Sequence, residues 1–184
     1  MNWGLVDNPS GHKIHKEPTP LLGGAAVFLG FFLPLLINGI FSREFGAILL
    51  CAMTLFVLGV LDDTLNLKAH VKLIVQIVLA VGLTFVGVRI ILVPETALLG
   101  SIVNRLLSVI WIVGITNAMN FFDGMDGLAA GLAAIISFFL AIVALQMDAP
   151  FVGWAALAMM GTCLGFLPYN FRPGKRALIF LGDA

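Results

Sequence analysis

The chain has 184 residues, of which 60% are hydrophobic and only 11% are charged, and its ten basic residues balance its ten acidic ones. A soluble domain carries roughly twice that share of charged residues, so the composition excludes one. A formal net charge of zero and the lack of a basic tract give no indication of a nucleic-acid partner. The mean hydropathy of +1.08 instead indicates an all-α, polytopic helical membrane protein with a single integral-membrane domain.

Hydropathy predicts six membrane-spanning helices, joined by short segments that carry turn and charge signals. The predicted spans are Leu22–Ile40, Phe45–Leu61, Val71–Leu92, Leu106–Phe121, Leu128–Met147 and Phe151–Leu167. Residues 1–21 and 168–184 then form polar segments on the same side as the second and fourth connections. The first 21 residues are too polar to be a signal peptide.

Successive connections between the spans must lie on alternate sides of the membrane. This alternation places unequal numbers of charged residues on the two sides. One side receives seven of the ten basic residues, with Lys72 at the edge of a span, and the other side only three. The positive-inside rule makes the first side cytoplasmic. Six of the seven aspartates and all three histidines fall on that same side. We therefore expect a functional site at the cytoplasmic face of the cell membrane.

Two adjacent carboxylates, Asp62 and Asp63, are predicted where the second span ends. Carboxylates at a helix C-terminus are disfavoured by up to about 1 kcal/mol each, and these two also repel one another. A divalent metal, a lysine or both would offset this cost. Lys72 stands nine residues after Asp63 at the start of the next helix and could fold back toward the pair. The alternative is a solvated acidic loop.

The stretch "NAMNFFDGMDGL" places Asn117, Asn120, Asp123 and Asp126 three residues apart at the end of an apolar run. On a straight α-helix such steps drift by about 60° each, which spreads the side chains around the surface. A tighter 3₁₀-like turn, or unwinding at the two glycines, would bring them to one face. Asn120, Asp123 and Asp126 would then offer the hard oxygen ligands that Mg²⁺ prefers.

Two further polar segments flank the spans. "YNFRPGKRALIFLGDA" carries Asn170, three basic residues and Asp183 after the sixth span. The N-terminal "DNPSGHKIHKEPTPLLGG" carries His12, Lys13, His15 and Lys16, and its twin glycines permit a close backbone approach or a tight helix start. Carboxylates and lysines together at a membrane surface suggest chemistry on phosphates, with a bound Mg²⁺ holding what the acidic groups alone would repel.

These motifs, taken in order along residues 7–183, resemble those of the polyprenyl-phosphate N-acetylhexosamine-1-phosphate transferases. The matching patterns are D-x-P, K-x-H, GG, DD-x₃-L-x₄-K-x₃-Q, N-x-x-N-x-x-D-G-x-D-G-L, GFL and I-F-L-G-D. The resemblance implies a Mg²⁺-dependent (or Mn²⁺-dependent) transfer of a sugar-1-phosphate from a UDP-N-acetylhexosamine to polyprenyl phosphate, undecaprenyl phosphate in a bacterium. UMP and the lipid-linked sugar that begins a cell-envelope glycan, such as lipopolysaccharide or teichoic acid, would be the products. The short gap between the aspartate pair and Lys72 favours UDP-N-acetylglucosamine as the donor over a pentapeptide-bearing one.

The resemblance also implies roles for individual residues. Asp183, with Asp123, would bind the metal, while Asp62, Asp63, Asp123 and Asp126 would be catalytic. Substrate contacts are implied for seven residues: Lys16, His15, Lys72, Asn117, Asn120, Asn170 and Phe180. Among these, Lys16, Asn170 and Phe180 would line the uridine pocket. The expected partners are the nucleotide sugar, the polyprenyl phosphate, the membrane and a second copy in a homodimer, with no nucleic acid.

Two alternatives remain at this stage. Ion-coupled secondary transporters also place Asp and Asn at helix interruptions, although their sites lie near the middle of the membrane. Members of the resembled family also continue through further helices, so we expect the chain to be truncated at both ends and consider an inactive fragment as the second alternative. Aromatic prenyltransferases fit less well because Gly127 and Ala130 stand where their pattern has aspartates.

Overall fold

The computed structural model describes residues 6–7, 19–20, 23–39, 42–65, 67–95, 98–174 and 176–182. Within these residues it contains six α-helices, so the predicted all-α class is confirmed. They are α1 (Gly23–Ile37), α2 (Arg43–Leu65), α3 (Ala69–Val86), α4 (Leu98–Phe122), α5 (Leu128–Gln146) and α6 (Pro150–Asn170). Two short strands, β1 (Val6–Asp7) and β2 (Thr19–Pro20), pair antiparallel near the N-terminus.

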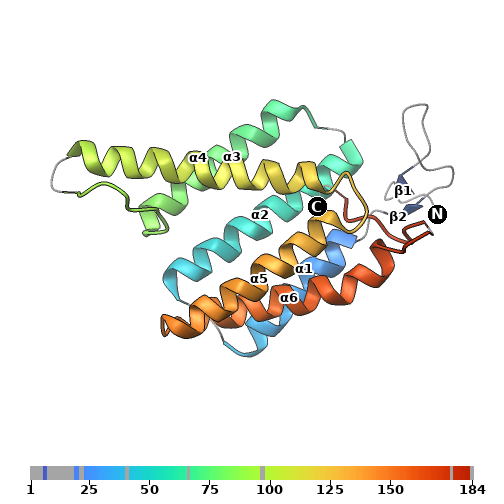
Figure 1. Cartoon of the computed structure of the whole chain (residues 1–184). Helices are drawn as coiled ribbons and strands as arrows, with labels where there is room; N and C mark the ends of the chain where they lie inside the picture. The colour runs from blue at the N-terminus through green and yellow to red at the C-terminus, as the bar shows by residue number, and fades with distance from the viewer. Residues whose placement is uncertain are drawn as a thin grey trace.

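The helices form two groups that are joined by α2. Helix α5 packs mainly against α6 and α6 against α1, while α4 packs against α3. Figure 1 shows α3 and α4 as one antiparallel pair and α1, α5 and α6 as the other group, with α2 running between them. Contacts between α4 and α5 are few, although these helices are consecutive. The two groups therefore diverge from the turn that joins α4 to α5.

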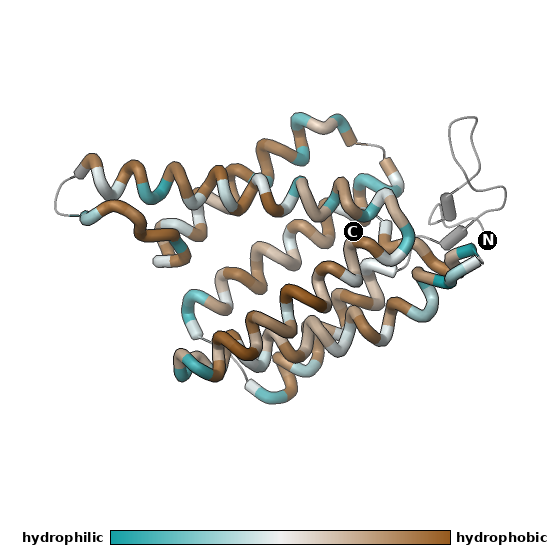
Figure 2. Tube along the Cα trace, viewed as in Figure 1, coloured by the Kyte–Doolittle hydropathy of each residue, from teal (hydrophilic) through white to brown (hydrophobic). Residues whose placement is uncertain are grey.

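Five of these helices are long and apolar enough to cross a membrane. The sixth, α1, has 15 residues and an internal Pro34, which gives it a length of about 22 Å. Apolar residues cover the middle of the bundle and polar ones gather at its two ends (Figure 2). The chain thus has the character of a multi-pass membrane protein, with many large apolar side chains, such as Phe139 and Leu145, on its outer surface.

Small residues let α5 and α6 approach closely. The buried residues of α5 are all alanine or serine, namely Ala129, Ala130, Ala134, Ser137, Ala141 and Ala144. On α6 the partner surface includes Gly153 and Ala156. Close backbone approach through small side chains is the usual way that membrane helices associate, because lipid removes the hydrophobic driving force between them. The connection at residues 123–127 leads directly into this hairpin, because α5 begins at Leu128.

The predicted boundary between the third and fourth spans is wrong. Helix α3 ends at Val86 rather than Leu92, because Gly87 adopts φ 108° and its N–H bonds back to Leu83. Helix α4 begins at Leu98 rather than Leu106. Residues 88–92 have no regular secondary structure although they are as apolar as a helix. Hydropathy could not separate the two conformations, because it measures the side chains and not the backbone.

Side chains of α4 satisfy the backbone of this non-helical segment. The Asn104 carboxamide is fully buried; it accepts from the N–H groups of Leu92 (3.1 Å) and Val93 (3.0 Å) and donates to the Val93 carbonyl (2.9 Å). Ser108 accepts from the N–H of Ile90 at 2.8 Å. Non-helical backbone near lipid is tolerated only when its polar groups are paired in this way.

We predict that Asn104→Leu destabilises the folded chain by several kcal/mol, since each buried backbone group left unpaired costs about 1–3 kcal/mol. Thermal unfolding in detergent would measure the loss. The control is Asn38→Leu, which removes an exposed side chain with one bond to the Pro34 carbonyl and should cost less than about 1 kcal/mol. Equal losses in the two variants would contradict this role for Asn104.

Candidate functional site

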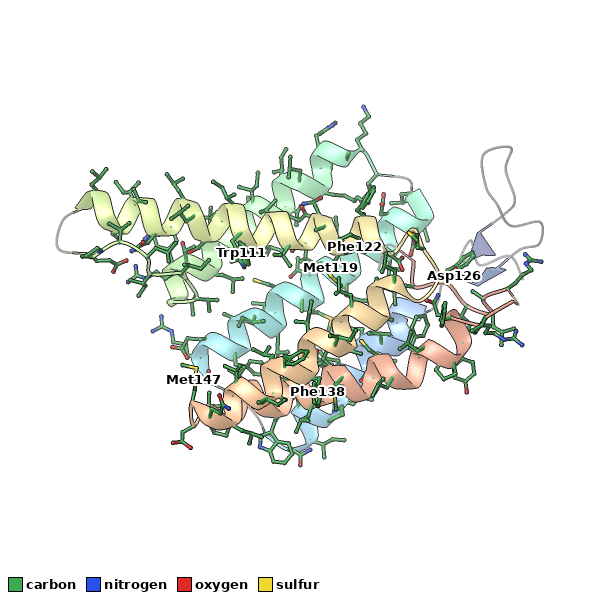
Figure 3. The ribbon with its side chains drawn as sticks, viewed as in Figure 1. Trp111, Met119, Phe122, Asp126, Phe138 and Met147 are labelled. Atoms are coloured by element: carbon green, nitrogen blue, oxygen red, sulfur yellow. The ribbon has the colours of Figure 1, made fainter. Side chains whose placement is uncertain are left out.

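The polar motifs meet at one end of the bundle, where α2, α4 and α6 finish and α1, α3 and α5 start. We call this the polar end. In Figure 3, Asp126 lies at this end, beyond the start of α5, whereas Met147 lies at the opposite end of the same helix. The antiparallel helices alone produce this grouping, because every second helix terminus reaches the same side. For the members of these clusters that the structure describes, the sequence prediction that they share one face is reproduced by the fold.

Asp62 and Lys72 form a partly buried ion pair across the α2–α3 turn. The Lys72 ammonium lies 2.5 Å from one Asp62 carboxylate oxygen, and the other oxygen accepts from the N–H of Leu67 at 2.6 Å. Asp62 is only 7% exposed and lies in the last turn of α2, with the half-buried Asp63 beside it. The cation expected near this pair thus includes Lys72. Both Asp62 oxygens thus accept hydrogen bonds within the protein. In the structure, Asp62 orients Lys72 and holds the turn.

The connection between α4 and α5 has the tighter geometry that the spacing required. The N–H groups of Asp123, Gly124 and Met125 each bond to the carbonyl three residues earlier, at 3.3–3.4 Å. Such 3₁₀-type bonds end α4 at Phe122, and Gly127 then adopts φ 77°. Asp123 is half-buried, whereas Asp126 is exposed. Of the two geometries that the sequence left open, the structure has 3₁₀-type bonds at residues 123–125.

A residue without an assigned role in the sequence analysis joins this site. Gln76 accepts a 2.7 Å hydrogen bond from the Asn117 carboxamide, which also donates to the Val113 carbonyl. Gln76 stands one helical turn after Lys72, so both side chains lie on the same face of α3. That four-residue spacing, with a second polar residue inside an apolar run, was the signal that could have identified it.

These polar side chains open onto a largely apolar cavity of about 430 Å³. Phe28, Phe31 and Phe56 line it on the α1 and α2 side, and Met119 and Met159 line it elsewhere. Its polar lining groups are Lys72, Gln76, Thr116, Asn117 and Asn120. Lys72 is the one charged residue among the described residues that line the cavity. The cavity can therefore accommodate a molecule with an apolar body and an anionic head.

The segment that precedes Asp183 forms part of the wall of the same cavity. Leu181 and Gly182 line it. The Phe180 and Leu181 carbonyls accept hydrogen bonds from the N–H groups of Gly23 (3.0 Å) and Gly24 (2.6 Å). A Cβ on Gly23 would collide with the Phe180 carbonyl and with the Phe166 ring. Both possibilities that the twin glycines left open are present, since α1 starts at Gly23 and the C-terminal segment approaches it closely.

Asn170, the last residue of α6, is buried and contacts two connections. Its side-chain oxygen accepts from the Gly127 N–H at 2.6 Å, and its nitrogen donates to the Ile179 carbonyl at 3.0 Å. The sequence analysis expected a nucleotide contact here, and that role stays a prediction. What is present is a hydrogen-bonded link between residues 123–127 and 178–182.

Three predicted site residues, His15, Lys16 and Asp183, lie outside the described residues. Among the described ones, no three His, Cys, Asp or Glu side chains are grouped closely enough to bind a metal. The oxygen-bearing side chains at this end, Asp63, Asn120 and Asp123, are nevertheless of the hard type that suits Mg²⁺. A carboxylate following Gly182 would enlarge this set, so the Mg²⁺ and Mn²⁺ predictions remain predictions.

Comparison with known proteins identifies the family. The family model described as "Glycosyl transferase family 4" matches residues 45–184. The chain belongs to glycosyl transferase family 4. This confirms the resemblance drawn from the motifs, and the matched residues include every site residue predicted from Asp62 onward.

Individual relatives within glycosyl transferase family 4 agree. The chain is 39% identical to a probable undecaprenyl-phosphate N-acetylglucosaminyl 1-phosphate transferase of Bacillus subtilis, over 98% of this chain and 51% of that protein. It is 33% identical to a decaprenyl-phosphate N-acetylglucosaminephosphotransferase of Mycolicibacterium smegmatis, over 100% and 50%. A phospho-N-acetylmuramoyl-pentapeptide-transferase of Prochlorococcus marinus is 34% identical, over 96% and 54%. The chain thus spans about half the length of these relatives.

Proposed function

We propose that the polypeptide carrying this sequence transfers N-acetylglucosamine 1-phosphate from UDP-N-acetylglucosamine to a polyprenyl phosphate, with release of UMP. Family membership supports a phospho-sugar transferase at the coarse level. The names of two relatives, both N-acetylglucosamine 1-phosphate transferases, and the short gap between Asp63 and Lys72 favour this donor sugar. A pentapeptide-bearing donor is the second candidate, because a third relative has that activity in its name.

The single observation that carries the proposal is the largely apolar cavity with Lys72 in its lining. The phenylalanine and methionine walls suit an isoprenoid chain, and its phosphate would lie beside Lys72, which also pairs with Asp62. Asn120 lies in the same lining, as does Asn117, whose two amide N–H groups are held by Gln76 and the Val113 carbonyl. Burying an anionic head inside a membrane protein is favourable only when such charge and donors are provided. A neutral lipid would gain nothing from the cation.

Mg²⁺, or Mn²⁺ in its place, would supply charge neutralisation of the donor diphosphate when bound. Asp123 and Asp183 would hold it, with Asp63 and Asn120 as further oxygen donors. The chain's own task is to bring the lipid phosphate, held by Lys72, into line with the β-phosphorus of the donor. An oxygen of the lipid phosphate then forms the new P–O bond as the bond from the β-phosphorus to the UMP oxygen breaks.

We place this reaction at the cytoplasmic face, where seven of the ten basic residues fall by alternation of the spans. Lys16, His15 and Phe180 are proposed nucleotide contacts, and Asp126 is a proposed catalytic carboxylate at the polar end. Nucleotide sugars are soluble and charged, so a site at the membrane surface suits them. A carrier site near the membrane centre, as in a transporter, does not match these positions.

The test is exchange of labelled UMP into UDP-N-acetylglucosamine by the complete polypeptide that carries this sequence, reconstituted with polyprenyl phosphate. We expect label in the nucleotide sugar only when both the lipid phosphate and a divalent cation are present. Uptake of labelled sugar into vesicles that contain the same polypeptide tests the alternative of transport. Uptake without exchange would contradict the transferase proposal and support the carrier.

A further inference from the structure

The buried Asn170 side chain is shared by two segments that are far apart in sequence. Gly127, its hydrogen-bond donor, lies 43 residues before it, and Ile179, its acceptor, lies nine residues after it. With 5% of its surface exposed, the residue has little area left for contact with a substrate. Its two side-chain polar atoms are both committed to protein backbone.

The segment on the C-terminal side of Asn170 is fixed at four successive residues. The Leu178 N–H donates to the Tyr169 carbonyl at 2.8 Å, and Ile179 accepts from Asn170. The carbonyls of Phe180 and Leu181 then accept from the start of α1. Because each residue is held in turn, the path of the chain is set up to Gly182, the residue before Asp183.

The segment on the other side is fixed at Gly127. Its backbone adopts φ 77°, and a Cβ there would lie 2.5 Å from the Cβ of Phe171, so the loop packs directly on the residue after Asn170. Gly127 is therefore held in two ways, by the hydrogen bond from its N–H to Asn170 and by its close packing against Phe171. Gly127 follows Asp123 by four residues, which limits how far that carboxylate can move relative to α6.

We propose that Asn170 is a positioning residue that sets the distance between the segment bearing Asp123 and the segment leading to Asp183. This inference rests on the proposed function, in which these two carboxylates hold one divalent cation. It assigns Asn170 a role different from direct recognition of the nucleotide. A carboxamide suits the task because it combines one acceptor and one donor on a short, rigid side chain. Neither Asp nor Ser provides both at this length.

The test uses Asn170→Asp in the complete polypeptide. The new carboxylate can still accept from Gly127, but its second oxygen opposes the Ile179 carbonyl. We expect the divalent-cation concentration for half-maximal UMP exchange to rise roughly 10–100-fold, as when an outer-shell partner of a metal site is lost. The KM for the UDP-sugar should stay within about twofold. Asn38→Asp, the same change at an exposed position, is the control and should alter neither value.

Hydrogen exchange followed by mass spectrometry provides a readout that needs no activity. The Leu178 amide and the Gly23 and Gly24 amides, which donate to residues 180 and 181, should exchange faster in Asn170→Asp, while those of the α5–α6 hairpin stay protected. Asn170→Ser, which is neutral, is the second variant should the added charge prevent folding, and the same results are expected. A raised KM for the UDP-sugar with unchanged cation dependence would overturn the proposal. So would unchanged exchange of the Leu178, Gly23 and Gly24 amides, even if no UMP exchange were detectable and the proposed function itself had failed.

Discussion

Asp123→Asn is expected to reduce the rate of UMP exchange by roughly 10²–10³-fold while leaving membrane insertion intact. The half-buried Asp123 lies in the turn that follows α4, and the amide keeps its size but removes the negative charge needed beside a cation. Asp183→Asn should have the same effect, because the proposal assigns both carboxylates to one metal. Initial rates at saturating lipid phosphate, measured over a range of Mg²⁺ concentrations, provide the measurement.

The matched control for this prediction is Asp148→Asn at the opposite end of the bundle. Asp148 follows α5 and adopts φ 51°, a conformation that Asn tolerates at least as well as Asp. The variant should retain the full rate. Near-normal exchange in both Asp123→Asn and Asp183→Asn would remove these residues from the catalytic assignment.

Lys72→Met is expected to lower both stability and activity. Removing the lysine leaves an uncompensated charge on the buried Asp62, at a cost of up to about 3 kcal/mol because the pair is only partly buried. The same change removes the cation that lines the cavity, so the KM for polyprenyl phosphate should also rise. Thermal unfolding in detergent and the dependence of UMP exchange on lipid phosphate measure the two effects separately.

The double variant Asp62→Asn, Lys72→Met separates these roles. The carboxamide introduced by Asp62→Asn is neutral and can still accept from the Leu67 N–H, so most of the lost stability should return. Activity should not return, because the cavity would still lack its cation. A double variant that is both stable and fully active would show that Lys72 serves only the fold.

Much of the polar end could be anticipated from local sequence. The step from Asp63 to Lys72 is short enough for a turn, so an ion pair across it follows from charge and helix direction. The 3₁₀ bonds at residues 123–125 follow from the three-residue spacing of the polar groups together with the glycines. Gly23 and Gly24 likewise indicated a close approach, although their partner at Phe180 could not be named.

The contacts that could not be predicted join residues far apart in the chain. Asn117 meets Gln76 across 41 residues, and Asn170 meets Gly127 across 43. Nothing in the local pattern at either partner specifies the other; tertiary packing of α3 on α4 and of α6 beside α5 decides it. The non-helical segment after Gly87 was missed for a related reason, since its stability depends on Asn104 and Ser108 from the next helix.

The proposed reaction at the cytoplasmic face depends on which side of the membrane the polar end faces, and cysteine labelling in sealed vesicles tests this most directly. In a background with Cys51 and Cys163 replaced by alanine, the single substitutions Asp126→Cys and Asp148→Cys would be exposed to a membrane-impermeant maleimide. We expect the Asp148→Cys variant to react from outside the cell, whereas the Asp126→Cys variant should react only from the cytoplasmic side. Labelling of the Asp126→Cys variant from outside would contradict the proposed orientation and, with it, a cytoplasmic active site.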